Sequence, residues 1–138
     1  MANAYQEMLN RAKQDAEELI KDSVSFAKAK AINTFDGWAD YINALESLEL
    51  SVMADSCADS WDTVIYHYKA LQLCIDCPSS VLSEAESASE DFGGDPVGLY
   101  ELASRIAYFI VTQAISEALQ DEVDGYIELA ESLQENFQ

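Results

Sequence analysis

"IAYFIVTQAISEALQDEVDGYIELAESLQE", residues 106–135, changes character half-way along its length. Over residues 108–115 nearly every face of a helix would be apolar, which is typical of a helix that passes through a protein core. From residue 117 onward, acidic residues recur at helical spacing. The stretch therefore predicts one long C-terminal helix, which we expect to have Pro96 in its first turn and to end near residue 137.

The second half of this helix carries six acids in steps of four, three, four, three and four residues. They are Glu117, Asp121, Asp124, Glu128, Glu131 and Glu135, and we call them the acidic stripe. At about 100° per residue they fall within an arc of about 80°. The apolar residues on the opposite side are Leu119, Val123, Tyr126, Ala130, Leu133 and Phe137. Like charges four residues apart cost roughly 0.2–0.5 kcal/mol per pair, so the stripe destabilises its own helix.

Apolar residues recur at helical spacing through the rest of the chain as well. The pattern predicts helices over residues 3–31, 36–53, 61–76 and within 79–95. Pro78 ends the third of these helices, and "ADSCADS" (54–60) supplies cap residues before its start. Gly93-Gly94 forms a turn after the fourth. No segment alternates as a strand does. The predicted fold is an all-α bundle of four to five helices with the long C-terminal helix as its spine.

Two sets of apolar side chains are expected to point into this bundle. In the second helix they are Trp38, Tyr41, Leu45, Leu48 and Val52. In the third they are Trp61, Ile65, Tyr68, Leu71 and Ile75. These residues, with the apolar half of the last helix, make up the predicted core.

Charge is distributed unevenly over the 138 residues, which we interpret as a single domain. The net charge is −19 at pH 7. Residues 1–31 form a charge-neutral N-terminal helix, whereas residues 36–138 form a strongly acidic helical body whose only cations are Lys69 and Arg105. A field this one-sided repels nucleic acid and anionic membranes and attracts basic protein surfaces.

The N-terminus lacks the basic start and apolar run of a signal peptide. The longest apolar run, residues 106–111, is too short to cross a bilayer. We therefore expect a cytoplasmic protein.

No catalytic motif accompanies these features. His67 is the only histidine, and we interpret it as a partly buried packing residue within "YHYK". The chain has no GxSxG, GxGxxG, P-loop or HExxH pattern. Because it has 26 acids, paired carboxylates are easy to find and indicate little. We expect no enzymatic activity and no cofactor.

Two segments resemble metal sites. Cys74 and Cys77 have CxxC spacing and, with Cys57 and His67, would give four zinc-type ligands, but a second tight pair is missing. Residues 120–131 match part of a calcium loop, but Gln120 stands where that loop needs its first carboxylate. We interpret the cysteines as packing residues and the acids as part of a helix, and the sequence leaves open whether either segment binds a metal.

The remaining explanation for the acids is that they imitate a polyphosphate. At duplex density, the 19 surplus charges correspond to about 32 Å of DNA, or roughly nine to ten base pairs. The predicted partner-binding surface combines the stripe with Asp36, Asp40, Asp55, Asp59 and Asp62, and residues 84–95 are acidic too. Such a surface would dock into the DNA-binding groove of a basic protein without any base readout.

Two runs, "MADSCADSWDTVIYHYKALQLC" (53–74) and "SRIAYFIVTQAISEALQDEVDGYIELAESL" (104–133), resemble the Ocr-like phage anti-restriction DNA mimics. The likeness covers about residues 36–137. It implies a helical acidic dimer that occupies the DNA channel of a type I restriction enzyme in the cytoplasm of a bacterial host. It also implies that Asp55, Asp59, Asp62 and the stripe belong to the mimic surface.

The sequence departs from that family in its charge-neutral first helix and in its end, "ENFQ", which lacks a long acidic tail. The first departure leaves the geometry of the dimer undetermined, and the second leaves the target enzyme undetermined. An anti-CRISPR type of inhibitor therefore also fits. The alternative is an acidic helical adaptor or chaperone for a basic protein partner.

Overall fold

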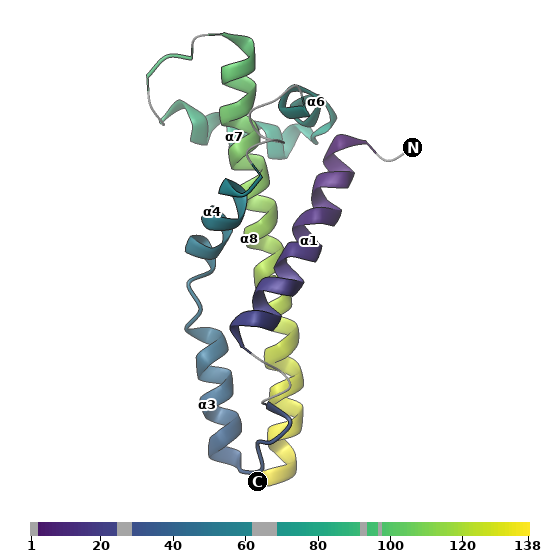
Figure 1. Ribbon diagram of the computed structural model, residues 1–138, viewed down its shortest axis with the longest axis vertical. Helices are drawn as coiled ribbons and strands as arrows, with labels where there is room; N and C mark the ends of the chain where they lie inside the picture. The colour runs from purple at the N-terminus through teal and green to yellow at the C-terminus, as the bar shows by residue number, and fades with distance from the viewer. Residues whose placement is uncertain (1–2, 25–28, 62–68, 92–93, 97) are drawn as a thin grey trace.

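The structure is a computed structural model, which describes residues 3–24, 29–61, 69–91, 94–96 and 98–138. These residues form six α-helices and one 3-10 turn (Figure 1). The elements are α1 (Ala4–Ser23), α3 (Phe35–Glu46), α4 (Leu50–Asp59), α6 (Lys69–Asp76), α7 (Ser79–Glu90), α8 (Leu99–Gln134) and η1 (Glu135–Phe137). None of the described residues forms a strand, so the all-α class is confirmed, with more helices than the four to five predicted.

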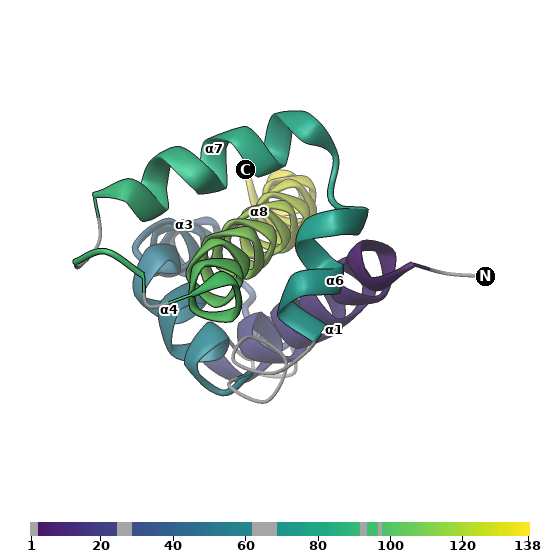
Figure 2. The ribbon, with the colours of Figure 1, turned by 90° about the horizontal axis from the view of Figure 1, so that it is seen from above.

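Helix α8 is the spine of the molecule, as predicted, and packs against every other helix of the described chain. Seen along its axis in Figure 2, it lies at the centre, with α7 on one side and α1 and α4 on the other. Its first half is buried on several faces at once, through Ile106, Ile110, Val111 and Ile115. Within the described chain, no helix is both long enough and apolar enough to cross a membrane.

Helix α1 runs alongside α8 and starts at a side-chain cap, in which Asn3 Oδ1 accepts from the backbone N–H of Gln6 at 2.8 Å. The backbone N–H of Ala4 donates to Asp76 Oδ2 at 2.8 Å, which ties the start of α1 to the end of α6. The helix ends at Ser23, because Val24 adopts an extended backbone. The predicted helix over residues 3–31 is therefore interrupted at Val24 and does not include residues 30–31, whereas Ala29 is helical and residues 25–28 lie outside the described chain.

The predicted helix over residues 36–53 is two helices, α3 and α4, separated by residues 47–49. Ser47 Oγ donates to the carbonyl of Asn43 at 2.7 Å, a local bond that competes with continuation of the helix. Leu48 and Leu50 are both half-buried at this break. Since α4 continues to Asp59, "ADSCADS" is mostly helical and is not the break between helices that the sequence predicted, while the start of the next helix falls on residues outside the described chain.

Two apolar residues that were predicted to face the core are exposed. Val52 is 55% exposed on α4, because the break after α3 resets the helical register that placed it inward. Ile75 is 65% exposed on α6. The prediction was correct for Trp38, Tyr41, Leu45 and Trp61, which are all buried. The predictions for Ile65, His67 and Tyr68 concern residues 62–68, which lie outside the described chain.

Pro78 is the N-cap of α7, which is the predicted short helix before the spine. Helix α8 begins at Leu99 after Gly98, so Pro96 precedes it and does not lie in its first turn. Gly93 of the predicted turn lies outside the described residues. At the other end, Phe137 belongs to η1 and is 40% exposed, which corrects its predicted inward position.

A polar cluster, which we call the Asp15 clasp, joins α1 to α4 and the residues that follow it. Trp61 Nε1 donates to Asp15 Oδ2 at 2.8 Å, and Cys57 Sγ donates to the same oxygen at 3.6 Å. Arg11 Nε lies 3.7 Å from this oxygen, and the Arg11 guanidinium lies 4.0 Å from the centre of the Trp61 ring. Trp61 is only 1% exposed, so its indole N–H requires this partner.

Replacing Ile115 with Asp is expected to unfold the protein, because Ile115 is fully buried on α8 and an unpaired charge there has no partner. Circular dichroism during heating would measure the loss. Ser132→Asp is the matched control, since it adds the same charge to an exposed position of the same helix. Similar melting temperatures for the two variants would contradict the central place of α8 in the core.

Candidate functional site

The acidic stripe lies along one side of α8, with all six side chains exposed. The helix runs through Gly125 without interruption, so the register that the sequence predicts is kept from Glu117 into η1. Eighteen residues at 1.5 Å each give the stripe a length of about 27 Å. Its inner side is anchored by Leu119, Val123 and Ala130, which are buried.

The stripe carboxylates have no cationic partner among the described residues. No Lys or Arg of the described chain forms an ion pair with any of them, since its two ion pairs join Arg11 to Asp15 and Arg105 to Glu101. Two stripe residues accept hydrogen bonds from neutral amides: Gln113 Nε2 donates to Glu117 at 3.1 Å and Gln120 Nε2 donates to Asp124 at 2.9 Å. These bonds orient the carboxylates without neutralising them.

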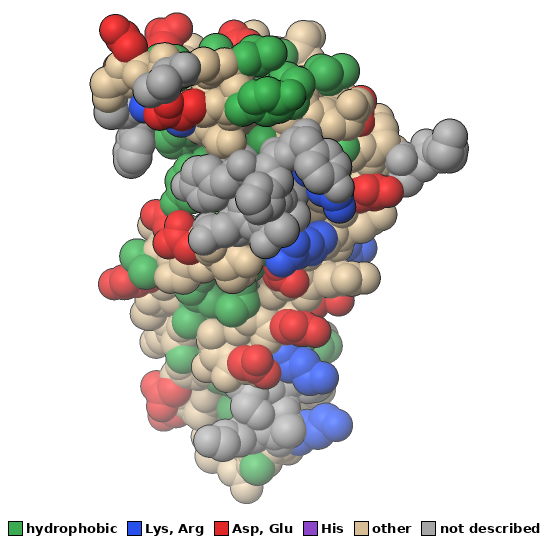
Figure 3. Space-filling view, turned by 45° about the horizontal axis from the view of Figure 1, so that its top comes forward, with side chains coloured by type: hydrophobic (Ala, Val, Ile, Leu, Met, Phe, Trp, Pro, Cys, Tyr) green, Lys and Arg blue, Asp and Glu red, His purple; other side chains and the backbone are tan. Residues whose placement is uncertain are grey.

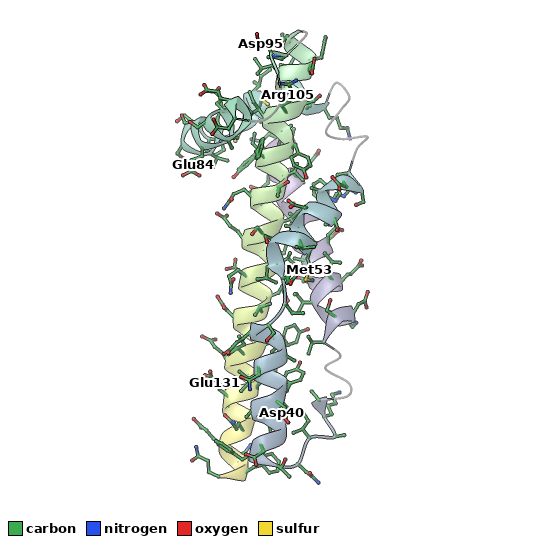
Figure 4. All side chains as sticks on the ribbon, turned by 90° about the vertical axis from the view of Figure 1, so that its left-hand side faces the viewer. Asp40, Met53, Glu84, Asp95, Arg105 and Glu131 are labelled. Atoms are coloured by element: carbon green, nitrogen blue, oxygen red, sulfur yellow. The ribbon has the colours of Figure 1, made fainter. Side chains whose placement is uncertain are left out.

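Helix α7 extends the acidic surface beyond the stripe. It packs on α8 near Phe109, Ile110 and Gln113, and Gln113 and Ile110 continue the stripe's side of the helix by one and two turns respectively. Ala85 and Ser89 of α7 are buried, whereas Glu84, Glu86 and Glu90 are exposed. In Figure 4, Glu84 and Glu131 lie along the same edge of the molecule. We call the stripe and these three glutamates the acidic face.

Asp36 and Asp40 lie on the outer side of α3, away from its buried Trp38, Tyr41 and Leu45. The start of α3 is fixed by Thr34, whose Oγ1 accepts from the backbone N–H of Gly37 at 3.0 Å. A Cβ at residue 37 would lie 2.8 Å from Ile32 Cγ2, so this close approach requires glycine. Gln134 Nε2 donates to the carbonyl of Phe35 at 3.3 Å and holds α3 beside the end of α8. Figure 4 shows Asp40 on the side next to the one that carries Glu131.

Asp55 and Asp59 are exposed on α4, which packs on the opposite side of α8 from α7 (Figure 2). They therefore do not join the acidic face. Asp62 lies outside the described residues. Of the predicted surface, the structure brings together the six stripe residues on one side and places Asp36 and Asp40 on the neighbouring side. The glutamates of α7 were missing from the predicted surface, because nothing in their local spacing shows that α7 folds over the stripe's side of α8.

Helix α1 borders the acidic face with a mixture of charges. Glu122, beside the stripe, has a raised pKa, mainly because it is partly desolvated and also because Glu17 is near, while Lys13 acts in the opposite direction. Figure 3 shows Lys and Arg side chains gathered along the side of the molecule that α1 occupies. The cations of the first helix therefore lie beside the acids and not among them.

The two segments that resemble metal sites have other structural roles. Residues 120–131 are helical throughout, so they form no calcium loop. Cys57 belongs to the Asp15 clasp, and Cys74 Sγ donates to the carbonyl of Ala103 at 3.6 Å. Within the described chain, no three His, Cys, Asp or Glu side chains come together in a geometry that would hold a metal ion.

No protein-family model matches this chain, and neither a curated protein nor a solved structure matches it.

The thiols of Cys57 and Cys74 are expected to react slowly with iodoacetamide at neutral pH. Burial raises the pKa of each from 9.0 to about 11, so little thiolate forms in the folded protein. Mass spectrometry should show alkylation rates that keep rising until about pH 11, against about pH 9 in urea. Between about pH 9 and pH 11 the unfolded chain has released the thiol protons that the folded chain still holds. The free energy of unfolding should therefore fall as the pH rises through this range. A plateau near pH 9 for the folded protein would contradict the burial of these thiols.

Changing Asp121, Asp124, Glu128 and Glu131 to their amides should stabilise the fold. The four changes remove all five like-charge pairs of neighbouring stripe residues, whose repulsion costs roughly 1–2.5 kcal/mol in total at low salt. Thermal denaturation should show a melting temperature higher by about 3 °C or more. The gain should shrink in about 1 M salt, where the Debye length is about 3 Å. A lower melting temperature would mean that these carboxylates have partners that hold the fold together.

Proposed function

We propose that this protein is a DNA mimic that inhibits a DNA-binding enzyme by occupying its DNA site. The observation that carries the proposal is the acidic stripe: six exposed carboxylates, without an ion pair to any described cation, on one side of a single helix. A purely solubilising role requires no such alignment, which costs the helix stability. The resemblance to the Ocr-like anti-restriction proteins supports the same function.

The spacing of the charges suits a protein that grips a phosphate backbone. The stripe presents one carboxylate about every 5 Å, compared with one phosphate per about 3.4 Å of a DNA strand. The glutamates of α7 and the aspartates of α3 add charge along and beside this line. Because phosphate contacts position a DNA-binding protein without reading its sequence, carboxylates at these intervals need to match only the basic groove.

In this mechanism the protein makes no bond and needs no cofactor. Lys and Arg side chains in the groove of the target exchange their phosphate partners for the carboxylates of the acidic face. A rigid helix keeps those carboxylates in place before binding, so little ordering entropy opposes the contact. The proposed target is a type I restriction enzyme or another nuclease complex of host defence, in the cytoplasm of a bacterium. The resemblance implies that the protein acts as a homodimer.

The proposal is tested by measuring how the protein displaces a fluorescent DNA duplex from a type I restriction enzyme. The variant with Asp121→Asn, Asp124→Asn, Glu128→Gln and Glu131→Gln should displace the duplex at least about tenfold less well, because the central groups of the stripe are lost. The control variant carries Glu7→Gln, Glu46→Gln, Glu49→Gln and Asp95→Asn. All four control positions are exposed and lie outside the acidic face, and the change in net charge is the same.

Equal effects of the two variants would show that total charge matters and that the stripe is not the contact surface. Displacement by the wild-type protein should also weaken steeply with added salt, since the contact is between charges. If the restriction enzyme does not bind, a low-salt pull-down from bacterial lysate, eluted with duplex DNA, tests the mimic against other targets. Retention that neither duplex DNA nor salt reverses would favour the adaptor alternative over the mimic.

A further inference from the structure

A groove of about 560 Å³ lies between α1 and α4, on the side of α8 away from α7 and the acidic face. The two helices both pack on α8 but have little contact with each other apart from the Asp15 clasp, which lines one end of the groove. From α1 the groove is lined by residues between Arg11 and Ser23, and from α4 by residues between Val52 and Ser60. At 1.5 Å per residue its walls run for about 12–18 Å.

The chemistry of the groove combines an apolar surface with acids. Leu19, Val52 and Met53 provide apolar surface, and Val52 is 55% exposed. Figure 3 shows apolar side chains in the middle of this side of the molecule, with Asp and Glu side chains beside them. Leu19, Val52 and Met53 thus line one continuous groove with apolar surface, and contiguous exposed apolar surface marks protein contacts.

The charge on the lining is one-sided. Arg11 is already engaged by Asp15 and the Trp61 ring. Glu18 and Asp22 of α1 are exposed and form no ion pair with any cation of the described chain. The two uncompensated carboxylates therefore favour a partner that carries basic side chains beside its apolar ones.

We propose that this groove binds an amphipathic helix of a partner protein, with apolar residues on Val52 and Met53 and with Lys or Arg facing Glu18 and Asp22. A groove between two helices offers no strand edge, so a helix is the form of peptide that its walls accept. Its length suits two to three helical turns. Because the groove and the acidic face lie on different sides of α8, a partner helix and a DNA-binding target would not compete for the same surface.

The test uses a fluorescein-labelled peptide of leucine and lysine, about 14 residues or roughly 21 Å of helix, with its leucines on one face. A peptide of the same composition with scattered leucines is the control for general attraction to an acidic protein. Fluorescence anisotropy in about 0.3 M NaCl, where the Debye length is below 8 Å, reduces that attraction. We expect the amphipathic peptide to bind at least about tenfold more tightly than its control.

Two pairs of variants locate the site. The first variant, Val52→Asp, puts a charge on the apolar surface of the groove. The second, Glu18→Lys/Asp22→Lys, reverses the charge of the two acids that line it. Each should weaken peptide binding by about tenfold. Ile75→Asp and Glu46→Lys/Glu49→Lys make the same charge changes at exposed positions outside the groove and should change binding less than twofold. All changed positions are exposed, and circular dichroism verifies that each variant is folded.

A second measurement compares the alkylation rates of Cys57 and Cys74, whose thiols both have a pKa of about 11. Cys57 lines the groove, whereas Cys74 contacts Ala103 elsewhere. Saturating peptide should slow the alkylation of Cys57 and leave that of Cys74 unchanged. The proposal is overturned if the amphipathic peptide binds no better than its control, if both pairs of variants act alike, or if the two cysteines are protected equally. The four stripe amides should leave peptide binding unchanged, so this test and that of the mimic can fail separately.

Discussion

The burial of α8 on several faces at once is the constraint on which the rest of the structure depends. Residues such as Ile106, Ile110, Val111 and Ile115 point in different directions from one helix axis, so no single neighbour can cover them. The remaining helices are accordingly arranged around this axis (Figure 2). Short helices suffice for this purpose, because each needs to cover only one side of the spine.

Towards its C-terminal end, α8 has fewer neighbours and half of its circumference is free. There the inner side still packs, through Leu119, Val123 and Ala130, while the outer side carries the acidic stripe. In this half of α8, packing against the core therefore uses one side of the helix, and the charge is concentrated on the opposite side. Repulsion within the stripe is tolerated because tertiary packing, more than local propensity, stabilises the helix.

The features that could be predicted from the sequence are those that local periodicity determines. The spine, the register of the stripe and the short helix after Pro78 all follow from spacing within one segment. The break at residues 47–49 contains neither glycine nor proline, so its only local signal is the weak one of Ser47. The exposure of Val52 and Ile75, the Asp15 clasp and the position of α7 over the stripe's side of α8 depend on how segments distant in sequence pack together. Single-segment patterns carry no information on such contacts.

The outward side chains of the stripe have a consequence for the evolution of the molecule. Asp121, Glu128, Glu131 and Glu135 are exposed, and no side-chain hydrogen bond or ion pair joins them to another described residue. Exchanging them requires no repacking, because the scaffold beneath is held by residues on the other side of α8. Natural selection can therefore shift or delete single carboxylates on this exterior while the interior stays as it is.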